Sequence, residues 1–173
     1  MTDYKFNLIK SVGSQGTSYN QFYEPFDLCL LNNNLYVCDK INKRLQVLNN
    51  DLDFVESLKL DFHPLQIKSL NLMLAVQATM EIYFYNSSDL SCIQKYDHGL
   101  CVISQINSNI YGFNSKASKL FCYGENSNLC EEINFDHKLL DDKCEWDGAM
   151  CELNGVLFMI SHSMRRIIKF SKH

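Results

Sequence analysis

The chain has 173 residues, of which 46% are hydrophobic and 21% charged, and its formal net charge is −4 at pH 7. This composition is ordinary for one globular domain with a real core, and it excludes a low-complexity or disordered chain. The N-terminus has no uninterrupted apolar stretch, and the longest apolar runs are far too short to cross a bilayer, so we expect a cytoplasmic protein without membrane contact. Eight cysteines lie mostly in apolar, strand-like runs, which favours free, buried thiols over a disulfide scaffold.

The strand-like segments, taken in chain order, fall into four similar units. Short β-rich runs alternate with turns of Asn, Asp, Gly or Ser, and no convincing helical period occurs. The expected strands are 25–31, 34–38, 43–48 and 53–60, then 64–69, 71–76, 81–85 and 90–96, then 100–105, 109–113, 119–123 and 129–134, and finally 148–153, 156–161 and 165–170.

The third strand of each unit shows the repeat most clearly. Its sequences are RLQVL, EIYFY, KLFCY and RIIKF, and their second residues are Leu45, Ile82, Leu120 and Ile167. Antiparallel four-stranded units that recur at about 40 residues are typical of a β-propeller. We therefore predict an all-β fold of about four blades, at 12–60, 61–96, 97–134 and 147–173, with an insertion at 135–146.

The two ends of the chain suggest how the ring closes. The fourth unit lacks an outer strand, while DYKFNLIK near the N-terminus resembles the outer strand of the first unit. We expect residues 4–10, within the segment 3–11, to complete the fourth blade and to leave no long exposed edge. The alternatives are a part of a six-bladed ring, or two chains that pair into a larger ring.

The first unit resembles a known repeat. GSQGTSYNQFYEPFDLCLLNNNLYVCDKINKRLQVLNNDLDFV, from Gly13 to Val55, is similar to an NHL repeat, with its Gly-x-x-Gly turn, Pro25, Asp39 and Arg44. The resemblance implies a propeller used for binding, as in the tripartite-motif ubiquitin ligases that carry NHL domains. The chain has no CxxC pair and no heptads, so the resemblance extends only to the recognition part of such a ligase.

The turns predict two faces of different charge. The turns between second and third strands carry seven basic residues, which we assign as the candidate binding residues: Lys40, Lys43, Arg44, Lys116, Lys119, Arg165 and Arg166. The turns on the opposite side carry Asp51, Asp53, Asp89 and Glu125. We expect the basic face to bind a protein partner, with RNA as the alternative. For Asp39 and Arg44, the competing interpretation is a structural ion pair.

A metal site is a further alternative. Glu24, His63, His98 and Asp147 open the inner strands of the four units, so a ring could gather them at the mouth of its channel. Such ligands suit zinc, and a zinc-dependent amidating lyase uses a propeller of this general type. However, the chain has no nucleophile elbow, phosphate loop or HExxH motif. We therefore expect a non-enzymatic protein without cofactor or small-molecule substrate.

The aromatic residues around Pro25 complete the expectations. Phe22, Tyr23 and Phe26 should fill the space between adjacent blades, and Trp146 should anchor the insertion by packing its large ring.

Overall fold

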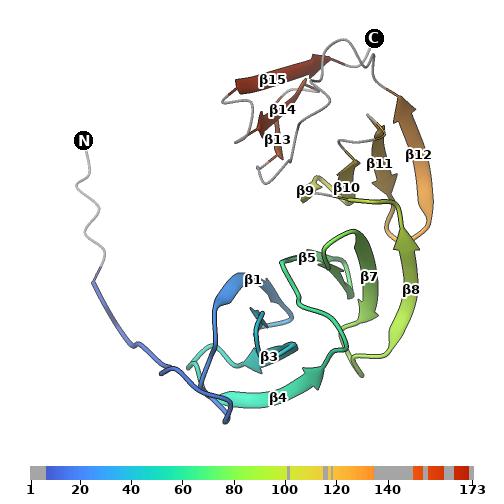
Figure 1. The fold of residues 1–173 in the computed structure, drawn as a ribbon. Coiled ribbons are helices and arrows are strands. Elements are labelled where there is room, and N and C mark those ends of the chain that lie inside the picture. The colour runs from blue at the N-terminus through green and yellow to red at the C-terminus, as the bar shows by residue number, and fades with distance from the viewer. Residues whose placement is uncertain are drawn as a thin grey trace.

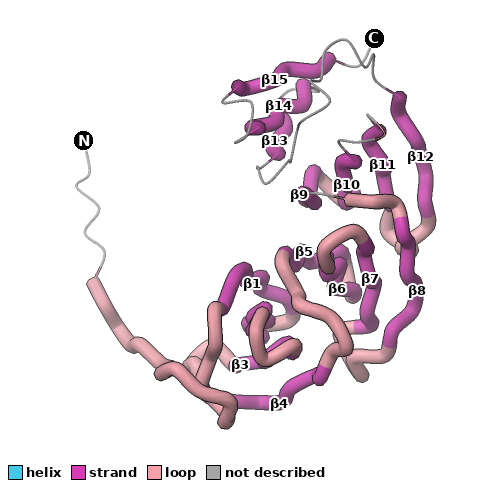
Figure 2. The backbone as a smooth tube through the Cα atoms, viewed as in Figure 1, coloured by secondary structure: helices cyan, strands magenta, loops and turns pink. Residues whose placement is uncertain are grey.

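The computed structural model describes residues 7–100, 102–114, 117, 119–134, 150–153, 156–161 and 166–171. All of its regular elements are β-strands, which form four antiparallel sheets along an arc (Figures 1 and 2). No helix among the described residues is long and apolar enough to cross a membrane. The expected all-β architecture is confirmed.

Each sheet is a meander whose strands follow the chain order. The first contains β1 (Pro25–Leu31), β2 (Asn34–Asp39), β3 (Arg44–Leu48) and β4 (Phe54–Lys59); the second contains β5 (Gln66–Leu70), β6 (Met73–Gln77), β7 (Glu81–Asn86) and β8 (Cys92–Asp97); the third contains β9 (Val102–Ile106), β10 (Asn109–Asn114), β11 (Lys119–Tyr123) and β12 (Leu129–Asn134); the fourth contains β13 (Met150–Leu153), β14 (Val156–Ser161) and β15 (Arg166–Ser171). No strand of these sheets begins or ends more than two residues from its expected position.

The turns between first and second strands explain one of these shifts. The sequence predicts a strand from residue 71, but Asn71 has φ 51° and forms the two-residue turn that joins Leu70 to Met73. Asn33 and Asn107 occupy the matching turns with φ 62° and 54°. Asparagine tolerates this left-handed conformation better than most residues, so it marks the turn and not the strand.

The core lies between successive sheets. The inner strands β1, β5, β9 and β13 contact one another in chain order along the inside of the arc (Figure 1). Three apolar clusters fill the spaces between sheets one and two, two and three, and three and four. The middle strands are buried on both faces, as their nearly continuous apolar sequences require, whereas the outer strands β4, β8 and β12 are largely exposed.

The N-terminal segment does not close the ring. Of the predicted strand 4–10, the structure describes residues 7–10, which form no strand and leave Leu8 86% and Ile9 97% exposed. Lys10 instead pairs with Asp53 at 3.0 Å in the turn between β3 and β4. Of these residues, Lys10 contacts the first sheet, at the other end of the arc from the fourth sheet, whose described part has three strands (Figure 1). The closure expected from the sequence is wrong for residues 7–10, because they approach the first sheet and pair with no strand of the fourth.

The cysteines that the structure describes are free, but only some are buried. Cys38 and Cys122 lie in the core, whereas Cys92, Cys130 and Cys151 are exposed. Burial raises the pKa of the partly exposed Cys29 to about 12, which keeps this thiol protonated at neutral pH. The expectation of buried thiols thus fails at the outer strands and at the last sheet.

Candidate protein-binding face

A buried carboxylate organises the first sheet and the segment that precedes it. Asp39 is fully buried at the end of β2, where its Oδ1 accepts a hydrogen bond from the Tyr23 N–H at 2.7 Å. Its Oδ2 accepts from Arg44 Nε at 2.7 Å, Asn42 Nδ2 at 2.9 Å and Gln46 Nε2 at 3.2 Å. A buried charge is tolerated only when its oxygens are satisfied in this way.

Arg44 extends the same network over the segment before β1. Its guanidinium donates to the carbonyl oxygens of Thr17 at 2.8 Å, Ser18 at 2.9 Å and Gln21 at 2.8 Å. Gln46 donates to the Gln21 carbonyl at 2.6 Å. Charge-assisted bonds of this kind hold the loop firmly on β3. Arg44 therefore has the structural role that its pairing with Asp39 predicts.

Apolar side chains are exposed at the turns next to this hydrogen-bond network. We call the side on which the second-to-third-strand turns open the turn face. Tyr23 is 40%, Ile41 39% and Met80 45% exposed, and they come from the β1 approach and from the turns of the first two sheets. The Ile41 N–H donates to the Tyr23 carbonyl at 3.1 Å, and the Met80 carbonyl accepts from Leu100 at 3.0 Å. Their backbones are thus held in place while their side chains remain available.

These apolar residues give no direct signal in the strand pattern, so the sequence did not predict them as binding residues. Ile41 interrupts the polar run DKINKR, and Met80 follows QAT in the same turn of the next unit. An apolar residue in an otherwise polar turn is the feature that could have revealed them.

The candidate basic residues are placed in different ways. Lys40 pairs with Glu24 at 3.1 Å and lies 5.1 Å from the centre of the Phe26 ring. Lys119 pairs with Glu132 on the neighbouring strand. Lys43, half-buried in the turn after Lys40, takes part in no ion pair among the described residues. Lys116 and Arg165 lie outside the described residues, and Arg166 begins β15 with a side chain that the structure does not describe.

Of the four residues considered as metal ligands, the three that the structure describes form no group that could hold a metal ion. Glu24 is engaged by Lys40, and His63 Nδ1 lies 2.9 Å from the Lys40 carbonyl oxygen, to which it donates. His98 Nδ1 is 2.6 Å from the Tyr123 hydroxyl, and burial lowers the pKa of this histidine. Asp147 lies outside the described residues. Within the described part of the chain, no three His, Cys, Asp or Glu side chains could hold a metal ion.

Two of the aromatic expectations are corrected. Phe26 is 58% exposed and Tyr23 is 40% exposed, so neither fills a space between blades. The reason is that β1 belongs to the first sheet of the arc and has no sheet before it. Phe62, by contrast, stacks on Tyr83 with ring centres 4.2 Å apart beside the first core cluster.

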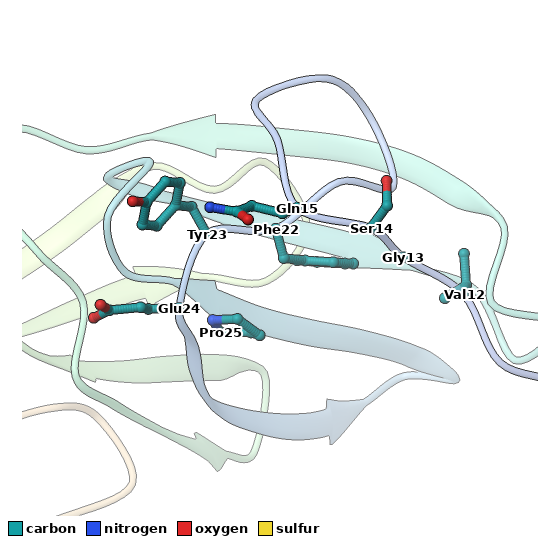
Figure 3. Close-up of a pocket in the computed structure, with 8 residues that line it drawn as sticks. All are labelled: Val12, Gly13, Ser14, Gln15, Phe22, Tyr23, Glu24 and Pro25. Carbon is teal, nitrogen blue, oxygen red and sulfur yellow. The ribbon is translucent and has the colours of Figure 1, made fainter.

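A shallow pocket lies next to Tyr23, on the side of the first sheet that no other sheet covers. It encloses about 580 Å³ between residues 12–15 and 22–25 (Figure 3). Glu24 is the one charged side chain of its lining, and this carboxylate already pairs with Lys40. Small-molecule sites present several convergent polar groups in a deeper cavity, so the pocket is better understood as part of an exposed surface.

Comparison with known proteins identifies the fold. The chain is similar to BamB from Moraxella catarrhalis (9% identity, TM-score 0.60, covering 82% of this chain and 41% of that one). It is also similar to the computationally designed Ika4 protein (4% identity, TM-score 0.66, 96% and 100%) and to virginiamycin B lyase from Staphylococcus aureus (10% identity, TM-score 0.57, 86% and 55%). The fold is that of a β-propeller.

The comparisons extend no further than the fold. No protein-family model matches the chain, and no curated protein sequence matches it. Likeness at these identities shows the propeller architecture and not the NHL type. The chain spans less than two thirds of the BamB and lyase chains.

Proposed function

We propose that this propeller is a non-catalytic recognition scaffold that binds a protein partner through its turn face. The observation that carries the proposal is the exposure of Ile41 and Met80 on hydrogen-bonded turns, with Lys40 and Lys43 on the same turn as Ile41. Aromatic residues and methionine are enriched at the centres of protein interfaces, and peripheral charges steer the encounter. Because the turns are already ordered, binding avoids the free-energy cost of fixing flexible loops.

The finer form of the proposal concerns the class of scaffold. Residues 13–55 resemble an NHL repeat, and the motif residues Asp39 and Arg44 hold that unit together. We infer that the chain acts like the substrate-recognition part of a tripartite-motif ubiquitin ligase, in the cytoplasm. The resemblance supports this inference. Identifying the bound partner would test it.

The first test places a photo-crosslinking amino acid on the turn face. We expect p-benzoylphenylalanine at Ile41 or Met80 to form a defined adduct with one protein in cells, identified by mass spectrometry. The matched control is Leu72, which is 66% exposed on the opposite side, in the turn between β5 and β6. Adducts of equal yield and identity from Leu72 would contradict the assignment of the turn face.

The second measurement uses the partner so identified. Lys40→Glu combined with Lys43→Glu should weaken its binding to the purified chain about tenfold, because each reversal replaces attraction by repulsion. Lys10→Glu is the control, because Lys10 lies at the turn between β3 and β4 on the opposite side, and it should leave affinity unchanged. Added salt should weaken the native complex, since exposed charges are screened over about 8 Å at physiological ionic strength.

RNA is distinguished by the same experiment. Adducts that disappear after ribonuclease treatment, together with a steep logarithmic dependence of affinity on salt, would replace the protein partner by RNA. Unchanged affinity of the double variant for the captured protein would show that the basic residues are only solvated surface.

A further inference from the structure

The two ends of the arc expose apolar sheet faces that the chain buries everywhere else. Strand register makes Leu45, Ile82, Leu120 and Ile167 equivalent positions, each at the second residue of a third strand and directed toward the following sheet. The first three are 0%, 0% and 3% exposed, whereas Ile167 is 73% exposed. The same repeat position is therefore core in three sheets and surface in the fourth.

A second position of the last sheet repeats this contrast. Ile160 on β14 is paired with Ile167, as Cys38 is with Leu45 and Phe113 with Leu120. Cys38 and Phe113 are fully buried, but Ile160 is 49% exposed.

The first sheet shows the complementary exposure on its other side. Leu28 lies on β1 at the position that Ile67, Ile103 and Met150 occupy on the inner strands of the later sheets. These three are 0%, 1% and 7% exposed, because the preceding sheet covers them, but Leu28 is 56% exposed. Leu30, on the same side of β1 as Leu28, is 59% exposed.

The internal clusters show what each exposed residue lacks. Each cluster joins a third-strand residue to an inner-strand residue of the next sheet: Leu45 with Ile67, Ile82 with Ile103, and Leu120 with Met150. By the same repeat, a fourth contact of this kind would pair Ile167 with Leu28. Figure 1 places β15 and β1 at opposite ends of the open arc, so one molecule does not form it.

We propose that a second copy of this chain supplies the missing pair and closes the propeller. Ile160 and Ile167 of each molecule would cover Leu28 of the other, so that two equivalent contacts join two arcs into one ring. A second copy is favoured because it carries both complementary faces at the same separation, and because each contact repeats one that the chain already makes three times internally. A head-to-tail contact that closes after two molecules also leaves no exposed sheet face for further growth.

The length of one related propeller is consistent with this arrangement. BamB, matched over 82% of this chain and 41% of its own, is about twice as long as this chain, virginiamycin B lyase (86% and 55%) is about one and a half times as long, and Ika4 (96% and 100%) has about the same length. Lys169 lies beside the exposed apolar residues, with its Nζ 6.0 Å from the centre of the Phe158 ring. Its long side chain can cover the ring and still keep the ammonium at the margin of the contact.

The test is sedimentation velocity of the full chain over a concentration series. The native chain should sediment with twice its monomer mass of 20.1 kDa. Leu28→Lys and Ile167→Glu should each raise the dimer dissociation constant at least about 100-fold, because the single change breaks both contacts and each loss is about tenfold or more. Ile93→Glu is the matched control: Ile93 is 46% exposed, lies on the outer strand of an internal sheet, and should not affect the dimer.

A mixture of the two variants tests the direction of the contact. Leu28→Lys and Ile167→Glu chains together can form one native contact and one lysine–glutamate contact. We expect the mixture to dimerise more tightly than either variant alone, while circular dichroism confirms that both variants keep the native β-sheet content. A native chain that stays monomeric throughout the series, a dimer unaffected by both variants, or assemblies that keep growing with concentration would each overturn the proposal.

Discussion

At the scale of single residues, Asp39 joins the sheet to its N-terminal segment. The carboxylate is fully buried, yet four donors surround it, from a backbone N–H, a guanidinium and two side-chain amides. The neighbouring Lys40–Glu24 pair has the same charges at 3.1 Å, but the Glu24 side chain is 56% exposed. Exposed pairs are weakened by solvent, and buried ones are costly to break, so the two pairs should contribute very differently to stability.

Asp39→Asn should therefore destabilise the protein by about 3–5 kcal/mol, because it removes the charge opposite Arg44 and turns an acceptor oxygen into a donor. Glu24→Gln, the matched isosteric change at the exposed pair, should cost less than about 1 kcal/mol. Urea denaturation followed by circular dichroism measures both. Equal effects of the two substitutions would show that the buried network does not organise the first sheet.

At the scale of the elements, the sheets are equivalent in backbone but not in side chains. Gly112 on β10 occupies the position of Val37 and Val76 in the first two sheets. A Cβ at Gly112 would lie 2.6 Å from Leu100 Cδ1 and 3.0 Å from its Cδ2. Leu100 is fully buried, so its side chain fills the space that a valine occupies in the other sheets.

Because Leu100 fills the space beside Gly112, we expect substitutions at these two positions to have coupled effects on stability. Gly112→Val alone should destabilise the protein by about 1–3 kcal/mol through overpacking, and Leu100→Ala alone by about 2–5 kcal/mol through the cavity it leaves. The double variant should lose at least about 1 kcal/mol less than the two single losses together, because the valine fills the cavity. A double-mutant cycle of urea denaturation midpoints measures this coupling, and strictly additive losses would refute it.

At the scale of the whole molecule, stability is shared between neighbouring sheets. The three core clusters lie between sheets, so each internal sheet is supported on both sides and each terminal sheet on one. In repeat proteins, a missing neighbour removes one interface from the stability of the terminal unit. Pairing of two arcs would restore support at both ends.

Thermal unfolding should consequently depend on protein concentration. If two chains close the ring, the native melting temperature should rise by about 1–3 °C for each tenfold increase in concentration, because mass action favours the associated state. The Ile167→Glu variant should melt at a temperature independent of concentration. Differential scanning calorimetry at several concentrations measures both, and a concentration-independent native transition would contradict the pairing of the arcs.

The sequence by itself determined the strands, their grouping into four units and the equivalence of Leu45, Ile82, Leu120 and Ile167. These features are local: alternating turns and apolar runs set strand boundaries, and the repeat spacing sets the register of one sheet against the next. The pairing of Asp39 with Arg44 was also predictable, because both residues flank one short turn.

Only the tertiary structure decided which of the equivalent positions are buried. Ile167 and Leu28 have the sequence character of core residues, yet they are exposed because burial depends on a neighbouring sheet and not on the residue itself. The contact of Lys10 with Asp53 at the first sheet joins residues far apart in the chain. Such long-range contacts leave no periodic signal, and for this reason the sequence predicted a closed ring where the structure is an open arc.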